Sequence, residues 1–220
     1  MTNTVTGRKI SILGVGKLGQ PIGRHWTLAN HSVVLGSRDP KNLASAVKEW
    51  EKEPVATTEL SDAADFGDVV LLTVPNPSLD GLLATLSERL AGKIVIDATN
   101  PIGRSEDGRI ISILDPGLTE GRRTAGLLPA SRVVRAFTHV MYELMWSRGR
   151  HQPMAWGMAL AGDDESAKGV VAELIADTGF TPIDIGGLDD SAALEPGGVL
   201  FPRMYSPADL RATLGLGQSG

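Results

Sequence analysis

The sequence predicts an α/β fold with a doubly wound, mostly parallel sheet and a small C-terminal α/β extension. Short runs of β-branched residues alternate with segments that carry helix signals, a pattern typical of strands buried on both faces of a parallel sheet. A glycine-rich loop follows the first of these runs. The strands expected in this part of the chain are residues 9–13, 32–35, 68–74, 93–97 and 132–137.

The loop Gly14-Val-Gly-Lys-Leu-Gly19 follows the first expected strand and opens a helix. Strand, loop, helix and second strand come in this order within about thirty residues, as a Rossmann-type dinucleotide-binding unit requires. Gly14 permits a tight turn, Gly16 lets the backbone approach a pyrophosphate, and Gly19 allows helix and strand to pack closely. Amide groups at the helix N-terminus would face the anion. The alternative is a tight turn that binds no ligand.

The end of the second strand, about twenty residues beyond the glycine loop, carries Ser37 and Arg38 where NAD would require an acidic residue. A carboxylate there would repel a 2′-phosphate, whereas a guanidinium binds it in a forked geometry. We therefore expect a site for NADP(H), with Lys41 adding a second positive charge. Asp39 precedes Pro40 and is better explained as a helix N-cap than as a ribose ligand. The alternative for Arg38 is an ordinary surface arginine.

Ligands of an open α/β sheet lie beyond the carboxyl ends of the strands. Further candidate cofactor-binding residues expected at this edge are Thr73, Val74, Pro75, Asn100 and Pro101. Pro75 would stiffen the backbone near a nicotinamide ring, and Asn100 could hydrogen-bond the carboxamide of that ring. The alternative is that the prolines end strands and Asn100 forms a turn.

His139 follows the strand at 132–137 and is the histidine that this arrangement places near the same edge. It is a candidate catalytic residue that could orient a substrate or exchange a proton. A single histidine is also often structural, and this alternative stays open. The spacing of histidine and glutamate residues indicates no metal site.

The second half of the chain predicts a strand at 154–160, a helix that starts near Asp163 and stops at Gly179, and an edge strand at 180–185. Methionine and tryptophan residues concentrate in 141–158, where core packing is favoured over a ring pocket or a subunit contact.

Residues 100–130 are predicted to form a long loop rich in glycine, proline and charge. Its arginines are nearly matched by acidic residues, which favours a solvated loop over an anion clamp. These arginines are Arg104, Arg109, Arg122 and Arg123.

The length of 220 residues indicates a single NADP-binding domain, with a core dinucleotide-binding part at 1–130 and an extension at 131–220 that completes the substrate pocket.

A net charge of -5 with interspersed signs argues against nucleic acid or an anionic membrane as partner. The absence of cysteine excludes disulfides and thiolate chemistry. Residues 1–7 show no secretory signal and no apolar run could span a bilayer, so we expect a cytoplasmic protein.

Seven motifs occur in order along the chain: Gly14-Val-Gly-Lys-Leu-Gly19, Leu35-Gly-Ser-Arg38, Leu72-Thr-Val-Pro75, Ile96-Asp-Ala-Thr-Asn-Pro101, Val134-Arg-Ala-Phe137, Ala161-Gly-Asp-Asp164 and Leu194-Glu-Pro-Gly-Gly198. Through these motifs the whole chain resembles the family of NADP oxidoreductases that use the deazaflavin coenzyme F420. Thr138 departs from the pattern of that family, since many relatives have asparagine there.

The resemblance implies hydride exchange between NADP(H) and a deazaflavin, a small-molecule redox substrate, in which geometry does most of the work. It also implies contacts with pyrophosphate from Gly16, Lys17 and Leu18, with the 2′-phosphate from Ser37 and Arg38, and with the nicotinamide region from Pro75.

Two other dehydrogenase classes do not fit the sequence. A short-chain dehydrogenase requires Tyr-x-x-x-Lys, but Trp146 and Asp209 stand where the lysine would follow the two tyrosines. Imine reductases and β-hydroxyacid dehydrogenases require a helical C-terminal domain that the residues after Ile185 are too few to build. An NADPH-dependent flavin or ferric reductase and a non-enzymatic NADP(H) sensor remain as alternatives. The methionine and tryptophan residues also allow a homodimer.

Overall fold

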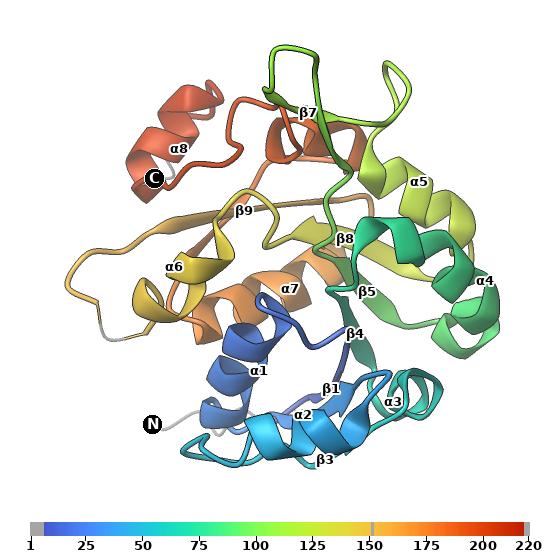
Figure 1. The fold of residues 1–220 in the computed structure, drawn as a ribbon. Coiled ribbons are helices and arrows are strands. Elements are labelled where there is room, and N and C mark those ends of the chain that lie inside the picture. The colour runs from blue at the N-terminus through green and yellow to red at the C-terminus, as the bar shows by residue number, and fades with distance from the viewer. Residues whose placement is uncertain (1–6, 151, 218–220) are drawn as a thin grey trace.

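The computed structural model describes residues 7–150 and 152–217, and in these residues eight strands form one sheet (Figure 1). Most of the expected opening segment, 1–7, lies outside the described residues. The sheet has the strand order β10-β9-β8-β5-β4-β1-β2-β3. The strands are β1 (Lys9–Leu13), β2 (Ser32–Gly36), β3 (Ala56–Thr58), β4 (Val69–Leu72), β5 (Ile94–Asp97), β8 (Arg132–Ala136), β9 (Gly157–Gly162) and β10 (Thr181–Asp184).

The pairing confirms the predicted doubly wound, mostly parallel sheet. Strands β3, β2, β1, β4, β5 and β8 pair in parallel, whereas β9 pairs antiparallel with β8 and β10 pairs in parallel with β9. β10 is the predicted edge strand, where Pro182 is tolerated. β9 begins later than predicted, at Gly157. The short strand β3 was not predicted, because its three residues are only partly buried and carry no apolar run.

Helices cover both faces of the sheet (Figure 1). Strand residues alternate between two apolar clusters, so that Ile12 contacts one layer and Leu13 the other. In the described part of the chain, no helix is both long enough and apolar enough to cross a membrane. One layer contains α1 (Gly19–Leu28), α2 (Pro40–Ala46) and α7 (Glu165–Asp177), and the other contains α3 (Leu60–Phe66), α4 (Leu79–Leu90) and α5 (Glu120–Leu127), with a 3-10 turn η1 (Asn76–Ser78) before α4.

The predicted helix ends are observed at α2 and α7. Asp39 caps α2 by accepting a hydrogen bond from the Asn42 amide at 3.1 Å, as its position before Pro40 indicated. Asp164 caps α7 through the Ala167 amide at 2.8 Å. The N-cap role that the sequence favoured for Asp39 is therefore observed.

The C-terminal segment packs onto the same sheet. Because β9 runs antiparallel to β8, their connection stays at the carboxyl end of β8, and this connection contains α6 (Tyr142–Ser147). Beyond β10, η2 (Leu188–Leu194) and α8 (Pro207–Thr213) contribute Leu194 and Leu210 to an apolar cluster on β9 and β10. The β8–β9 connection therefore places side chains at the carboxyl ends of the parallel strands, where ligands of such sheets bind.

The prediction of a long loop at 100–130 is wrong. The segment contains an antiparallel hairpin, β6 (Ile102–Arg104) with β7 (Ile110–Ser112), and the helix α5. Short strands with exposed side chains carry little apolar periodicity, which is why the sequence did not reveal them.

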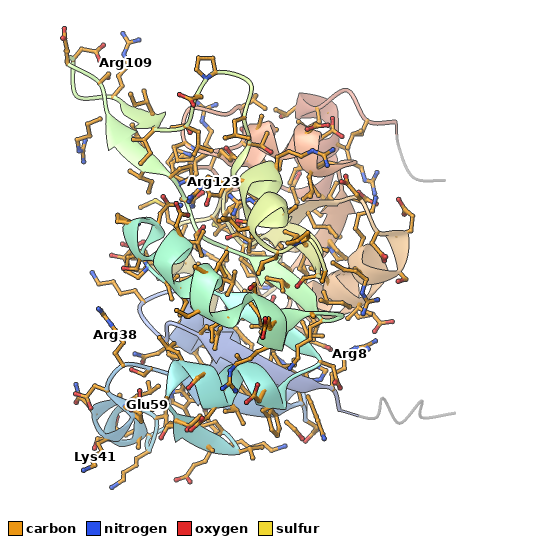
Figure 2. All side chains as sticks on the ribbon, turned by 90° about the vertical axis from the view of Figure 1, so that its right-hand side faces the viewer. Arg8, Arg38, Lys41, Glu59, Arg109 and Arg123 are labelled. Atoms are coloured by element: carbon orange, nitrogen blue, oxygen red, sulfur yellow. The ribbon has the colours of Figure 1, made fainter. Side chains whose placement is uncertain are left out.

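Three of the four arginines of this segment, Arg109, Arg122 and Arg123, pair with acidic residues, whereas Arg104 donates to the Gly108 carbonyl at 3.1 Å. Arg122 binds Asp163 at 2.5 Å and Asp189 at 2.6 Å. Arg123 binds Glu120 at 2.8 Å, and Figure 2 shows it against the body of the protein, with Arg109 far away at the tip of the hairpin.

Candidate functional site

A cavity of about 910 Å³ opens at the carboxyl ends of β1, β2 and β4. Its opposite wall includes Gly81, Leu82 and Thr85 of α4 and Tyr142 of α6, with Leu60 of α3 and Ser78 of η1 beside them. The residues predicted to bind the cofactor that line this cavity are Gly14, Gly16, Lys17, Leu18, Ser37, Arg38, Thr73, Val74 and Pro75.

The three glycines of the loop have different surroundings. Gly14 has φ +88°, and a Cβ there would lie 2.6 Å from Val74 Cγ1. A Cβ on Gly19 would lie 2.7 Å from Thr73 Oγ1. A Cβ on Gly16 would meet nothing within 4 Å, so no packing contact within the described protein requires a glycine there. The bare backbone at Gly16 suits the close approach of a pyrophosphate.

Thr73 fixes the loop from the end of β4. Its Oγ1 donates a hydrogen bond to the Gly14 carbonyl at 2.6 Å, and its amide donates to the Leu13 carbonyl at 2.9 Å. Its hydroxyl hydrogen is therefore committed to the protein. Thr73 lines the cavity by shaping the loop, and a direct contact with the cofactor stays a prediction.

Ser37 and Arg38 leave donors available at the end of β2. Ser37 Oγ accepts the Asp39 amide at 3.1 Å, which leaves its hydroxyl hydrogen free for a phosphate. Arg38 is exposed and makes no ion pair within the described residues. Figure 2 shows Arg38 extending into open space and Lys41 lying apart from it on α2. Lys41 does not line the cavity.

Asn100 and Pro101 lie outside the cavity lining. Asn100 Nδ2 donates to the Thr138 carbonyl at 2.9 Å, which ties the loop after β5 to the loop after β8. Asn100 Oδ1 and Thr138 Oγ1 are buried without a partner among the described residues. The role of Asn100 in binding the carboxamide of nicotinamide stays a prediction.

His139 is fully buried between β8, β9 and the C-terminal segment. Its Nε2 accepts the Ala159 amide at 3.1 Å, so Nδ1 carries the hydrogen and donates to the Arg203 carbonyl at 3.2 Å. Burial lowers the pKa of His139 to about 4. Both ring nitrogens thus serve the fold, and the catalytic role of His139 stays a prediction.

Tyr142 was not among the predicted site residues. The methionine and tryptophan cluster that contains it separates into buried Met145 and Met158, and exposed Trp146 and Met154. The core interpretation therefore holds for part of the cluster only. Tyr142 reaches the cavity because β9 runs antiparallel to β8, and the sequence patterns did not reveal this pairing.

The fold and cavity define a dinucleotide-binding protein: a mostly parallel sheet, a glycine loop against an open cavity, and an arginine at the end of β2 that has no ion pair among the described residues. The family model described as NADP oxidoreductase coenzyme F420-dependent matches residues 9–101. The F420-dependent NADP reductase of Methanocaldococcus jannaschii is 30% identical over 198 residues, which cover 85% of this chain and 87% of that protein. The chain belongs to this family and is an NADP-dependent oxidoreductase.

Two further similarities extend this result. Metalloreductase STEAP3 of Rattus norvegicus is 28% identical over 187 residues, which cover 85% of this chain but 36% of that protein. A solved structure of a hypothetical protein from Sinorhizobium meliloti superimposes with a TM-score of 0.79 at 27% identity, covering 90% of this chain and 95% of that one. The similarity thus includes the C-terminal segment as well as the glycine loop.

Gly16→Val is expected to weaken NADPH binding by more than about tenfold, because the side chain occupies the path of the pyrophosphate. The thermal midpoint should stay within about 2 °C, since the Cβ meets no protein atom within 4 Å. Gly14→Val is the matched control: its positive φ and its contact with Val74 should lower the thermal midpoint. Unchanged NADPH affinity in Gly16→Val would contradict the loop assignment.

The free energy of unfolding is expected to fall as the pH drops from about 6.5 towards 4, because the unfolded chain takes up a proton that folded His139 refuses. The slope from this residue is about 1.4 kcal/mol per pH unit. Urea denaturation of the wild type and His139→Gln at several pH values measures it. The other buried histidines of the described residues, His25 and His31, are present in both proteins, so the difference in slope isolates His139. Equal slopes would show that His139 does not titrate in this way.

Proposed function

We propose that this enzyme transfers hydride between NADP(H) and the deazaflavin coenzyme F420. The observation that carries the proposal is the similarity to an F420-dependent NADP reductase along nearly the whole of both chains. The family model that matches residues 9–101 supports it.

The residues present fit NADP(H). The open space at Gly16 accommodates the pyrophosphate, with Lys17 and Leu18 beside it. Ser37 and Arg38 would hold the 2′-phosphate, with one hydroxyl and one guanidinium. Lys41, Asn100 and Pro101 would act from outside the cavity lining, Lys41 as a charge near the phosphate and the other two near the nicotinamide.

The chain needs few acid or base groups for this chemistry. When bound, NADPH supplies the hydride, and the protein positions the two reactants and excludes water. Val74 and Pro75 form the cavity wall on the side where the nicotinamide is expected. Since both nitrogens of His139 bind backbone groups, we infer that His139 joins β9 to the C-terminal segment and does not transfer a proton in the reaction.

A flavin or ferric reductase is the second candidate, because the chain is also similar to a metalloreductase. A non-enzymatic sensor is less well supported, since the chain belongs to a family of oxidoreductases.

A cytoplasmic location and a homodimer stay predictions. Met141 and Met154 are exposed and are the residues that a subunit contact would cover.

Arg38→Ala is expected to weaken NADPH binding by about 1.5–3 kcal/mol, because it removes a charge-assisted contact with the 2′-phosphate. NADH lacks this phosphate, so its affinity should change little. Calorimetric titration of both cofactors measures the difference, and Arg104→Ala, an exposed arginine on the hairpin, is the matched control. Equal losses for NADPH and NADH would refute the specificity for NADP(H).

The acceptor is tested by stopped-flow oxidation of NADPH with coenzyme F420, a flavin and a ferric chelate at equal concentrations. We expect the deazaflavin to give the highest kcat/KM. Faster reduction of the flavin or the ferric chelate would favour the second candidate instead. No turnover with any acceptor would favour the sensor.

A further inference from the structure

Tyr142 brings the C-terminal extension into the cofactor cavity. It is the first residue of α6, lines the cavity, and lies 125 residues away in sequence from Lys17 of the glycine loop. Because β8 and β9 are antiparallel, their connection stays at the carboxyl edge of the sheet, directly over the start of α1 (Figure 1). The fold therefore places an aromatic hydroxyl at the mouth of the phosphate site.

The packing of α6 fixes the position of Tyr142. Trp146 contacts two residues of α1: the Arg24 guanidinium lies 3.9 Å from its ring centroid, and the centroid of the His25 ring lies 4.7 Å away. Arg24 is itself held by two hydrogen bonds to Glu51, at 2.6 and 2.7 Å. Met145 on the same helix is fully buried. The helix α6 is thus anchored on α1, the helix that the glycine loop begins.

The contact between Lys17 and Tyr142 leaves donors for an anion. Lys17 Nζ donates to Tyr142 Oη at 3.1 Å and lies 5.0 Å from the centroid of the ring. Since the phenol oxygen accepts this bond, its own hydrogen is free to donate to another group. An ammonium that donates to a hydroxyl strengthens that hydroxyl as a donor. The free hydrogens of Lys17 and the phenol both belong to residues that line the cavity with Gly16.

We propose that Tyr142 is a further cofactor-binding residue, which together with Lys17 hydrogen-bonds the pyrophosphate of NADP(H) at the mouth of the cavity. This proposal rests on the cofactor site described under the proposed function. Tyr142 is paired with the glycine loop, whereas the 2′-phosphate site lies at the end of β2 with Ser37 and Arg38. Tyr142 therefore recognises the part of the molecule that NADPH and NADH share.

The test measures dissociation constants of NADPH, NADH and adenosine 2′-monophosphate for the wild type and Tyr142→Phe. Phenylalanine keeps the ring beside Lys17, and the hydroxyl it removes is on a side chain that is 38% exposed, so the fold should be retained. The affinities for NADPH and NADH should fall by the same factor, about tenfold. Adenosine 2′-monophosphate has no pyrophosphate, and its affinity should be unchanged. Tyr205→Phe, which removes the other phenol of the chain, is the matched control.

Each outcome separates the two assignments. If the wild type binds NADPH and Tyr142→Phe binds both dinucleotides with unchanged affinity, the role of Tyr142 is overturned. The assignment of the cofactor site is then unaffected. Equal weakening of adenosine 2′-monophosphate would also overturn it, because a general structural effect would then explain the loss. A wild type that binds neither dinucleotide would overturn the cofactor site itself. The double variant Lys17→Met, Tyr142→Phe tests whether the two residues act as a pair. Adding Tyr142→Phe to Lys17→Met should weaken dinucleotide binding by a smaller factor than Tyr142→Phe does in the wild type.

Discussion

The packing of the glycine loop against the end of β4 is the constraint on which the site depends. The Thr73 hydroxyl holds the Gly14 carbonyl, the Gly14 amide donates to the Gly36 carbonyl at 3.1 Å, and Val74 fills the space that a side chain on residue 14 would need. The ends of β1, β2 and β4 therefore meet with no room for a Cβ on Gly14. This close contact opens the backbone at Gly16 and directs the start of α1 at the cavity.

A buried polar cluster joins the C-terminal segment to the same edge of the sheet. Arg135 of β8 donates to the carbonyls of Asp97 at 3.0 Å and Thr99 at 2.8 Å, and lies 3.1 Å from the Asp97 carboxylate. Glu195 accepts the amide of Glu120 at 2.7 Å, and burial raises the pKa of Glu195. Truncating one partner of such a cluster is costly, because it leaves a buried charge unpaired. The cluster thus holds the strand ends and the extension in one arrangement.

Local patterns predicted the features that depend on local physics. Apolar runs located the buried strands, Asp39 before Pro40 located a helix cap, and the glycine loop located the cavity. Features set by tertiary contacts were missed. The hairpin β6–β7 exposes its side chains, and Tyr142 reaches the cavity only because β9 reverses direction beside β8. No local periodicity encodes that reversal.

The acceptor is the part of the function that this fold specifies least. Hydride transfer between two rings depends on their distance and alignment, so a family can change its acceptor by changing the shape of the pocket without moving a catalytic acid. Relatives of this chain named as an F420-dependent reductase and as a metalloreductase share similar identity with it, 30% and 28%. On the proposed cofactor side, the glycine loop and Arg38 line the cavity. Substrate choice in this family is therefore expected to follow the shape of the pocket and not the placement of a catalytic acid.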